Sequence, residues 1–311
     1  GESDARLLVN LAMTYWIQDK TEDSIKTMEK AKELDNESWI WLDQMKEYVK
    51  EGKDWNKKAI DSYVKENPDG YNVVMFLGCV IPNRYPFIEA ATRAVFNELG
   101  IGVMEAEGAS CCPAPGVFRS FDIETWLLLG ARNITISEEQ NRDFVTMCNG
   151  CYGTLNDVNY ELQNEKEKKE WVNEKLKEIG KEYKGEITVR HIVDVLYNEI
   201  GLEQLKKRIV NKFDGLKVAV HYGCHILKPH FNKPWDYSAV EDPHFLDEIV
   251  ELTGAESVDY KDKLMCCGAG GAVRAGSKQV SLDFTKTKLT NMRNAGADII
   301  IDCCPFCQRQ M

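Results

Sequence analysis

The spacing of the cysteines constrains this chain more than any other feature. A single cysteine, a vicinal pair and a Cys-x-x-Cys pair follow one another in that order, and the whole pattern occurs twice. The first set is Cys79, Cys111, Cys112, Cys148 and Cys151, and the second set is Cys224, Cys266, Cys267, Cys304 and Cys307. The gaps before the vicinal pair are 31 and 41 residues, and the gaps after it are 35 and 36. Only Cys303 of the 11 cysteines lies outside the pattern, so the sequence predicts two sites of five thiolates each.

The overall composition argues against several classes of partner. A formal net charge of −11 disfavours nucleic acid and anionic membrane surfaces, because both reward clustered Lys and Arg. No apolar run reaches the roughly 18 residues that a membrane span requires, and the first residues do not resemble a signal peptide. Eleven cysteines without an export signal favour a reducing compartment, where such thiols are more often metal ligands or redox centres than disulfides. We therefore expect a cytoplasmic protein with no nucleic-acid partner and no membrane span.

The cysteine-free N-terminal region predicts a separate helical segment. Apolar residues follow helical spacing through residues 1–66. Asn67-Pro68-Asp69-Gly70 is a turn signal that marks a boundary. We predict a helical segment over 1–70, a first cysteine-bearing domain over 71–210 and a second over 211–311.

Short apolar runs that end at or near cysteines predict the main strands. These runs are residues 71–77, 144–147, 217–221 and 298–301, and shorter strands are expected at 103–104 and 257–260. Helices are expected at 85–99, 121–131, 137–142, 161–184, 243–253 and 277–294. This alternation predicts an α/β fold: two tandem units with parallel strands, preceded by a small all-α segment. Because ligands gather at the carboxyl ends of parallel strands, the five thiols of a set are expected to meet at one rim.

Five thiolates per site favour iron–sulfur chemistry over the alternatives. A zinc site needs four ligands, so zinc would leave one thiolate of each set unused, and adjacent cysteines fit one tetrahedral ion poorly. Structural disulfides fit neither the compartment nor the duplication, and a thiol-relay oxidoreductase needs only one reactive pair. An iron–sulfur centre presents several irons and accepts bridging thiolates.

The glycine-rich stretch after the second vicinal pair is interpreted as a tight turn over a metal centre. Gly268-Ala269-Gly270-Gly271 resembles part of a dinucleotide-binding fingerprint, but Val273 stands where that fingerprint has its third glycine. Nucleotide binding is therefore the less favoured interpretation.

Three of the five histidines, His221, His225 and His230, lie close to Cys224, and Lys228 is among them. Histidines in such loops act either as hydrogen-bonded supports or as proton donors and anion contacts. The sequence leaves both roles open.

Four stretches resemble the B subunit of the archaeal heterodisulfide reductase, which carries the cysteine-rich CCG domain twice. They are residues 76–86, 108–116, 147–153 and 221–225, and the resemblance extends over 71–311. It implies two noncubane [4Fe-4S] clusters, one held by the first set of cysteines and one by the second.

The resemblance also implies a reaction and partners. The heterodisulfide CoM-S-S-CoB would lie between the clusters and be reduced to the thiols of coenzyme M and coenzyme B. Electrons would come from the iron–sulfur C subunit of the reductase and ultimately from its flavin-carrying A subunit. Our hypothesis is a reduction in two one-electron steps, with His225 selected for protonation and Lys228 for contact with a sulfonate or phosphate.

Three departures from the family accompany the resemblance. Cys111-Cys112-Pro113 replaces the literal CCG, residues 1–70 are not part of a minimal B subunit, and the chain stops four residues after Cys307. We expect its C-terminus to be truncated relative to the family. The alternative functions are an iron–sulfur electron-transfer subunit of another CCG oxidoreductase, such as a glycolate oxidase or a thiol:fumarate reductase, and a non-catalytic electron-transfer or scaffold subunit.

Overall fold

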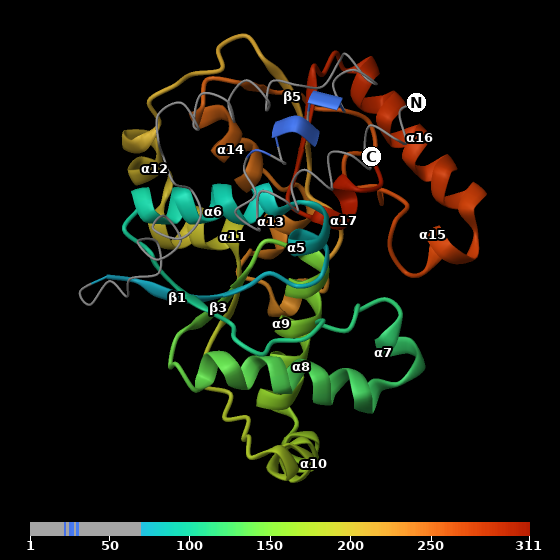
Figure 1. Ribbon diagram of the computed structural model, residues 1–311. Helices are drawn as coiled ribbons and strands as arrows, with labels where there is room; N and C mark the ends of the chain where they lie inside the picture. Colours follow the sequence, from blue (N-terminus) through green and yellow to red (C-terminus); the bar gives the residue numbers. More distant parts are fainter. Residues whose placement is uncertain (1–21, 23–24, 28, 31–69) are drawn as a thin grey trace. The chain divides into compact units, whose positions relative to one another are not determined.

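Figure 1 shows the computed structural model of the chain, in which the structure describes residues 22, 25–27, 29–30 and 70–311. The chain divides into two units, Gly1–Lys65 and Glu66–Met311. The described residues of the first unit are helical. The remainder of the helical prediction for 1–70 falls outside the described residues. All cysteines belong to the second unit.

A four-stranded parallel sheet organises the first half of the second unit. Its strands are β1 (Asn72–Phe76), β2 (Gly102–Glu105), β3 (Asp143–Thr146) and β4 (Val189–His191), in the order β2-β1-β3-β4. Every residue of β1 is buried, as expected of a central strand covered on both faces. The sequence prediction misses β4, because its three residues include Arg190 and do not form an apolar run.

A three-stranded parallel sheet organises the second half. Its strands are β5 (Lys217–His221), β6 (Glu256–Ser257) and β7 (Ile299–Asp302), in the order β6-β5-β7. The strand expected at 257–260 is limited to Glu256–Ser257, and Val258 and Tyr260 pack into the core without a strand partner. The two sheets confirm the predicted fold class of two α/β units with parallel strands.

The helices connect the strands and cover the sheets. In chain order they are α5 (Val80–Arg84), α6 (Pro86–Glu98), α7 (Phe118–Phe121), α8 (Ile123–Glu138), α9 (Asn149–Asn164), α10 (Lys166–Leu176), α11 (Ile192–Asp194), α12 (Leu202–Arg208), α13 (Tyr237–Glu241), α14 (Phe245–Leu252), α15 (Val273–Gly276), α16 (Lys278–Asn294) and α17 (Pro305–Gln308), with a 3₁₀ turn η1 (Lys177–Ile179), a π-helical turn η2 (Val195–Ile200) and a 3₁₀ turn η3 (His230–Asn232). None of the described helices has the length and apolar character that a membrane crossing needs.

Two helix predictions are wrong in their boundaries. Instead of separate helices at 121–131 and 137–142, one helix, α8, runs through the gap between them and ends at Glu138, and residues 139–142 are not helical. Its first turn is capped by Asp122, which accepts a hydrogen bond from the Thr125 N–H. The long helix expected over 161–184 is broken at Glu165, which has extended backbone dihedrals between α9 and α10. Helical structure ends before Gly180, whose left-handed conformation (φ +70°) terminates η1.

One hydrophobic cluster joins the two halves. It contains Trp126 and Phe144 from the first half together with Cys267, Cys304 and Cys307 from the second. The helices α8, α9 and α10 pack on one another at one end of this unit, away from α14 and α16 (Figure 1). The proposed boundary between domains 71–210 and 211–311 remains a prediction, because the core crosses it.

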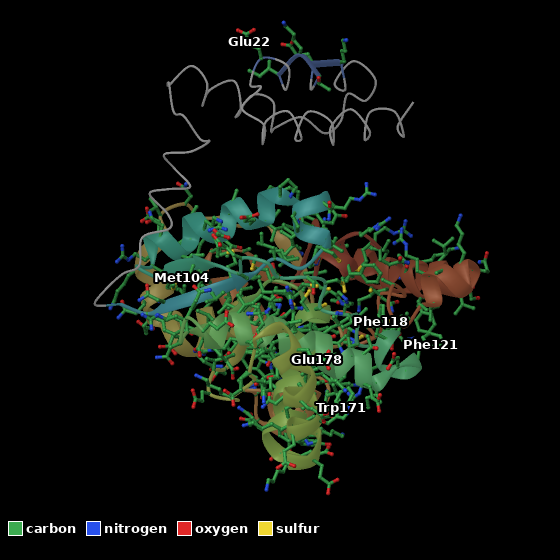
Figure 2. The ribbon with its side chains drawn as sticks, turned by 60° about the horizontal axis from the view of Figure 1, so that its bottom comes forward. Glu22, Met104, Phe118, Phe121, Trp171 and Glu178 are labelled. Atoms are coloured by element: carbon green, nitrogen blue, oxygen red, sulfur yellow. The ribbon has the colours of Figure 1, made fainter. Side chains whose placement is uncertain are left out.

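The short helix α7 leaves apolar surface uncovered. Phe121 is 84% exposed and Phe118 is 45% exposed, and both side chains project from the unit near α8 (Figure 2). Single exposed apolar residues are common on proteins, but a phenylalanine with most of its surface in water is unusual.

Candidate metal centres

The strand ends deliver the cysteines to the N-termini of helices. Cys148 follows β3 and is the N-cap of α9, and Cys304 follows β7 and is the N-cap of α17. Cys79 follows β1 and is the N-cap of α5. Cys151 and Cys307 lie within the helices that Cys148 and Cys304 begin. The N-terminus of a long helix such as α9 favours negative charge, but the contact with Cys304 and burial raise the pKa of Cys148 there.

The structure brings the five thiols of each set into one contiguous row. In the first set, side-chain contacts join neighbours in the order Cys79, Cys111, Cys112, Cys151 and Cys148. In the second set they join Cys224, Cys266, Cys267, Cys307 and Cys304. The Sγ atoms of Cys267 and Cys307 are 3.5 Å apart. Corresponding cysteines occupy the same place in both rows, so the sequence repeat is also a repeat in space.

The two rows meet at their buried ends. Cys148 of the first set contacts Cys304 of the second, and α5 contacts α17 beside them. Cys148 and Cys304 are buried, whereas Cys79 and Cys224 at the far ends of the rows are exposed. Each site therefore has an interior end that faces the other site and an outer end open to water.

Crowding of the thiols sets their ionisation. Contacts with Cys224 and Cys267 lower the pKa of Cys266, whereas the contact with Cys266 raises the pKa of Cys267. Thiols whose sulfurs are in contact along a row cannot all be ionised, because each thiolate disfavours ionisation of its neighbour. Full ionisation of a row needs a compensating positive charge among the sulfurs.

In the first set, Asn133 holds the loop that carries the vicinal pair. This asparagine of α8 is fully buried, and its Nδ2 atom donates to the carbonyls of Ser110 (3.4 Å) and Cys111 (3.2 Å). The Ser110 N–H donates back to its Oδ1 atom at 3.0 Å. Thr154 of α9 donates to the Pro113 carbonyl at 2.7 Å. The loop is thus fixed from two helices of its own half.

In the second set, one face of α16 holds the corresponding loop. Lys288 donates to the carbonyl of Met265, the residue before the vicinal pair, and to that of Lys263, both at 2.9 Å. Thr285 donates to the Cys267 carbonyl and Ser281 to the Gly268 carbonyl, also at 2.9 Å. These three side chains, spaced along one stripe of α16, are buried.

Polar contacts join the halves where the rows meet. Asn149, the first residue of α9, donates from Nδ2 to the Tyr222 carbonyl at 2.7 Å. The thiol of Cys303 donates to the same carbonyl at 3.2 Å. His191 accepts from the Val193 N–H at Nδ1, so its Nε2–H donates to the Cys303 carbonyl at 3.1 Å. Cys303, the cysteine outside the repeat, therefore belongs to the junction between the halves rather than to either row.

His221 lies against the second row. It is the last residue of β5, the position that Phe76 occupies in β1, three residues before the first cysteine of each set. A nitrogen of its ring and the sulfurs of Cys267 and Cys307 lie within 4.8 Å of one another. Within the described part of the chain, neither ring nitrogen has a hydrogen-bond partner. Burial lowers the pKa of His221 to about 3, so the ring is a neutral donor near the sulfurs.

Known proteins of one family share these features. Residues 73–156 and 218–311 match the cysteine-rich domain family CCG. The chain is 55% identical to the B subunit of the ferredoxin/F420H2-dependent CoB–CoM heterodisulfide reductase of Methanosarcina acetivorans, over 76% of this chain and 78% of that one. It is 53% identical, with the same coverage, to the B subunit of the ferredoxin:CoB–CoM heterodisulfide reductase of Methanosarcina mazei. It is 28% identical to the B subunit of the fumarate reductase (CoM/CoB) of Methanothermobacter marburgensis, over 81% of this chain and 43% of that one.

The chain belongs to the family of heterodisulfide reductase B subunits. The predicted family and the predicted class, an oxidoreductase with cysteine-rich CCG domains, are confirmed. The relatives are named as single subunits of larger reductases, which agrees with a chain that works with other subunits.

The thiols fit an iron–sulfur cluster better than a single ion. Five sulfurs in one row exceed the four ligands of a tetrahedral ion, and their crowded charges call for several cationic atoms among them. His221 with Cys267 and Cys307 is the one group of three metal-binding side chains within reach of a single ion among the described residues, and it lies inside the second row. The donor set therefore supports iron–sulfur centres and offers zinc no complete four-ligand site apart from the rows.

The residues selected for protonation and anion contact lie near Cys224. His225 packs against Gly153 of α9, so closely that a Cβ atom at position 153 would lie 2.8 Å from the Cβ of His225. Burial lowers the pKa of His225. Lys228 is exposed, and its side chain has no hydrogen bond or ion pair with another described residue. Their roles remain predictions. The sequence pointed to His221 only as one of three histidines near Cys224, and its place beside Cys267 and Cys307 comes from the structure.

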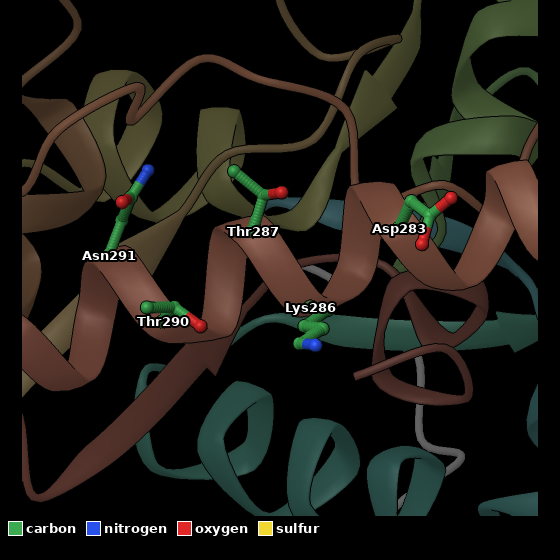
Figure 3. Close-up of a pocket in the computed structure, with 5 residues that line it drawn as sticks. All are labelled: Asp283, Lys286, Thr287, Thr290 and Asn291. Atoms are coloured by element: carbon green, nitrogen blue, oxygen red, sulfur yellow. The ribbon is translucent and has the colours of Figure 1, made fainter.

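A separate hollow lies on the outer face of α16. Its lining is drawn in Figure 3 and consists of Asp283, Lys286, Thr287, Thr290 and Asn291. The stripe of Ser281, Thr285 and Lys288 that supports the cysteine loop is buried on the other side of the same helix. The hollow contains no thiol and is not part of the metal centres.

Proposed function

We propose that this chain is the subunit that reduces the heterodisulfide of coenzyme M and coenzyme B, at two noncubane [4Fe-4S] clusters held by the two cysteine sets. One observation carries the proposal: two matched rows of five thiols meet at Cys148 and Cys304. Identities of 55% and 53% to the B subunits of heterodisulfide reductases support the choice of substrate.

The reaction requires electrons, protons and two separate sulfur sites. Cleavage of the S–S bond consumes two electrons and two protons and yields two thiols. Iron–sulfur clusters supply electrons one at a time, so two adjacent centres match a two-electron reduction. The cysteines of each row would hold one centre, and the buried contact between Cys148 and Cys304 brings the two rows together at their inner ends.

The chain's own side chains would deliver protons and bind the charged ends of the substrate. His225 follows Cys224 directly, at the water-exposed end of the second row, and is proposed to pass a proton to the leaving thiolate. Lys228 is exposed three residues further on and is proposed to contact a sulfonate or phosphate.

Other subunits would supply the electrons. We propose that the donors are the iron–sulfur C subunit of the reductase and, behind it, the flavin-carrying A subunit. Exposed apolar side chains on α7 and α16 offer contact surface for such partners: Phe118, Phe121, Val280, Leu282 and Phe284.

The test is anaerobic purification and reconstitution, followed by measurement of iron, acid-labile sulfide and zinc. We expect iron and sulfide sufficient for two clusters, little zinc, and oxidation of a reduced viologen dye when CoM-S-S-CoB is added. A colourless, iron-free protein that binds zinc would refute the proposal.

A second candidate is an electron-transfer subunit of another CCG reductase, as the 28% identity to a fumarate reductase subunit suggests. The viologen assay separates the two functions. An iron-loaded chain that accepts electrons from the dye but leaves the heterodisulfide intact would be the electron-transfer subunit.

A further inference from the structure

The loops that carry the two vicinal pairs are held in the same way by different side chains. In each half, a buried residue of the following long helix donates to the carbonyl that precedes the pair. That residue is Asn133 in the first half and Lys288 in the second. The backbone geometry repeats, but a neutral amide is replaced by a cation.

Lys288 is buried beside the second row without a carboxylate. Its side chain makes hydrogen bonds to two carbonyls and lies over the Tyr260 ring, with 5.2 Å from Nζ to the ring centroid. Among the residues that the structure describes, no carboxylate forms an ion pair with it. A buried ammonium group is costly unless an opposite charge lies nearby.

The second row supplies that opposite charge. Burial lowers the pKa of Lys288 to about 8, and Cys267, Cys307, Cys224 and Cys266 oppose this effect by favouring the charged form. The thiols of the second set are therefore the groups that favour a charged Lys288 against its burial.

The first row has no such cation among the described residues. The strongest influences on its thiols are other cysteines and burial. The strand residue behind that row is Phe76, where the second row has the N–H donor His221. Both differences place a lysine and an imidazole beside the second row, where the first row has an amide and a phenyl ring.

We propose that Lys288, assisted by His221, makes the two centres unequal by raising the reduction potential of the second one above that of the first. A nearby positive charge and N–H donors stabilise the reduced centre, which carries one more negative charge. The second centre then holds an arriving electron while the first passes it on. Lys288 and His221 are positioning residues: Lys288 acts through its charge, and His221 acts through the polar N–H of its neutral ring. The inference rests on the proposed function only in requiring that both sets bind a cluster.

The test is a redox titration of the whole reconstituted protein, followed by electron paramagnetic resonance. The signal that is lost in Cys267→Ser is assigned to the second centre. We expect Lys288→Met to disfavour reduction of that centre about tenfold, a fall of about 59 mV for one electron, with the first centre unchanged. His221→Phe, which copies the first half, is expected to give a smaller shift in the same direction. Lys286→Met, on the exposed face of α16, is the control and should shift neither centre.

Because Lys288 also supports its loop, Lys288→Gln is measured in parallel. Glutamine keeps an amide donor for the carbonyls but carries no charge, so a charge effect must appear in it too. A Lys288→Gln centre at the native potential, or an equal shift of both centres, overturns the inference. An iron-free native protein would instead end the proposed function, so the two failures are distinguishable.

Discussion

The two halves of this chain build the same thiol row on the same backbone and surround it with different side chains. Each half places a single cysteine after its central strand, a vicinal pair in a loop and a Cys-x-x-Cys pair at a helix start. Behind the rows the halves diverge: Phe76 and Asn133 support the first, His221 and Lys288 the second. The repeated backbone fixes where the sulfurs lie, and the unrepeated side chains determine the charge around them.

The junction between the halves departs furthest from the repeat. Asn149 follows Cys148, whereas Pro305 follows Cys304, so at this position only the first half has an amide side chain that reaches across. Cys303 precedes Cys304, whereas Met147 precedes Cys148. Two equal halves would meet with equal contacts, but here Asn149 donates to the Tyr222 carbonyl of the second half, and the Cys303 thiol of that half donates to the Asn149 Oδ1 atom. The halves are therefore adapted to each other and are not interchangeable copies.

Loss of one thiol from either row should have the largest effect. Cys112→Ala and Cys267→Ala remove corresponding members of the two rows, and we expect each to lose about half of the iron and to abolish disulfide reduction. Iron content, the electron paramagnetic resonance spectrum and the viologen assay measure the outcome. Cys303→Ala is the matched control and should keep both iron and activity. Full activity in both ligand variants would contradict the assignment of the rows.

A methyl group on the glycine before the first cysteine should damage one row selectively. Gly78 has φ +66°, and a Cβ atom there would lie 2.6 Å from the Cys151 sulfur. Gly223 is its counterpart, with φ +74° and the Cys307 sulfur at 3.5 Å. Gly78→Ala is expected to lose iron from the first centre while the second remains, because the sulfur has no room to move in the crowded row.

Gly180→Ala separates strain from collision. Gly180 has a similar left-handed conformation (φ +70°), but a Cβ atom there would meet nothing within 4 Å. We expect this variant to lose roughly 1 kcal/mol of stability and to keep all its iron. Equal iron loss in Gly78→Ala and Gly180→Ala would show that backbone strain alone accounts for the effect.

Cutting the contact across the junction should cost stability without removing a ligand. Asn149→Ala leaves the buried Tyr222 carbonyl with only the weak Cys303 thiol donor. We expect the free energy of unfolding to fall by about 1–3 kcal/mol. Chemical denaturation of the reconstituted protein measures this change in the free energy of unfolding. Asn164→Ala removes a similar amide-to-carbonyl bond at the exposed end of α9 and should cost much less. Similar losses in the two variants would mean that the junction is not a special point of attachment.

The sequence predicted the central strands and the grouping of the cysteines because each depends on a local pattern. Apolar runs such as 71–77 and 217–221 mark central strands, and the cysteine spacing alone pairs Cys79 with Cys224 and Cys112 with Cys267. The broken helix at Glu165 and the short strand β4 carry no comparable signal. Lys288 was missed as a neighbour of the second row because its importance lies in contacts across the fold, and His221 was named only as one of three histidines near Cys224. An alignment of the two halves by their cysteines would have revealed the exchange of Phe76 for His221.

The helices behind the two vicinal pairs, α8 and α16, differ in their N-terminal caps. Asp122 caps α8 by accepting from the Thr125 N–H at 3.0 Å, whereas Ser277 at the start of α16 makes no side-chain cap. Asp122→Ala should therefore lower the melting temperature a little, and Ser277→Ala should leave it unchanged. Asn133 on α8 supports the loop of the first centre, and Lys288 on α16 supports that of the second. A loosened first turn in α8 should therefore also broaden the electron paramagnetic resonance signal of the first centre alone. If Ser277→Ala proved as destabilising as Asp122→Ala, the two helices would be capped alike, and the difference between the halves would be confined to the side chains beside the sulfurs.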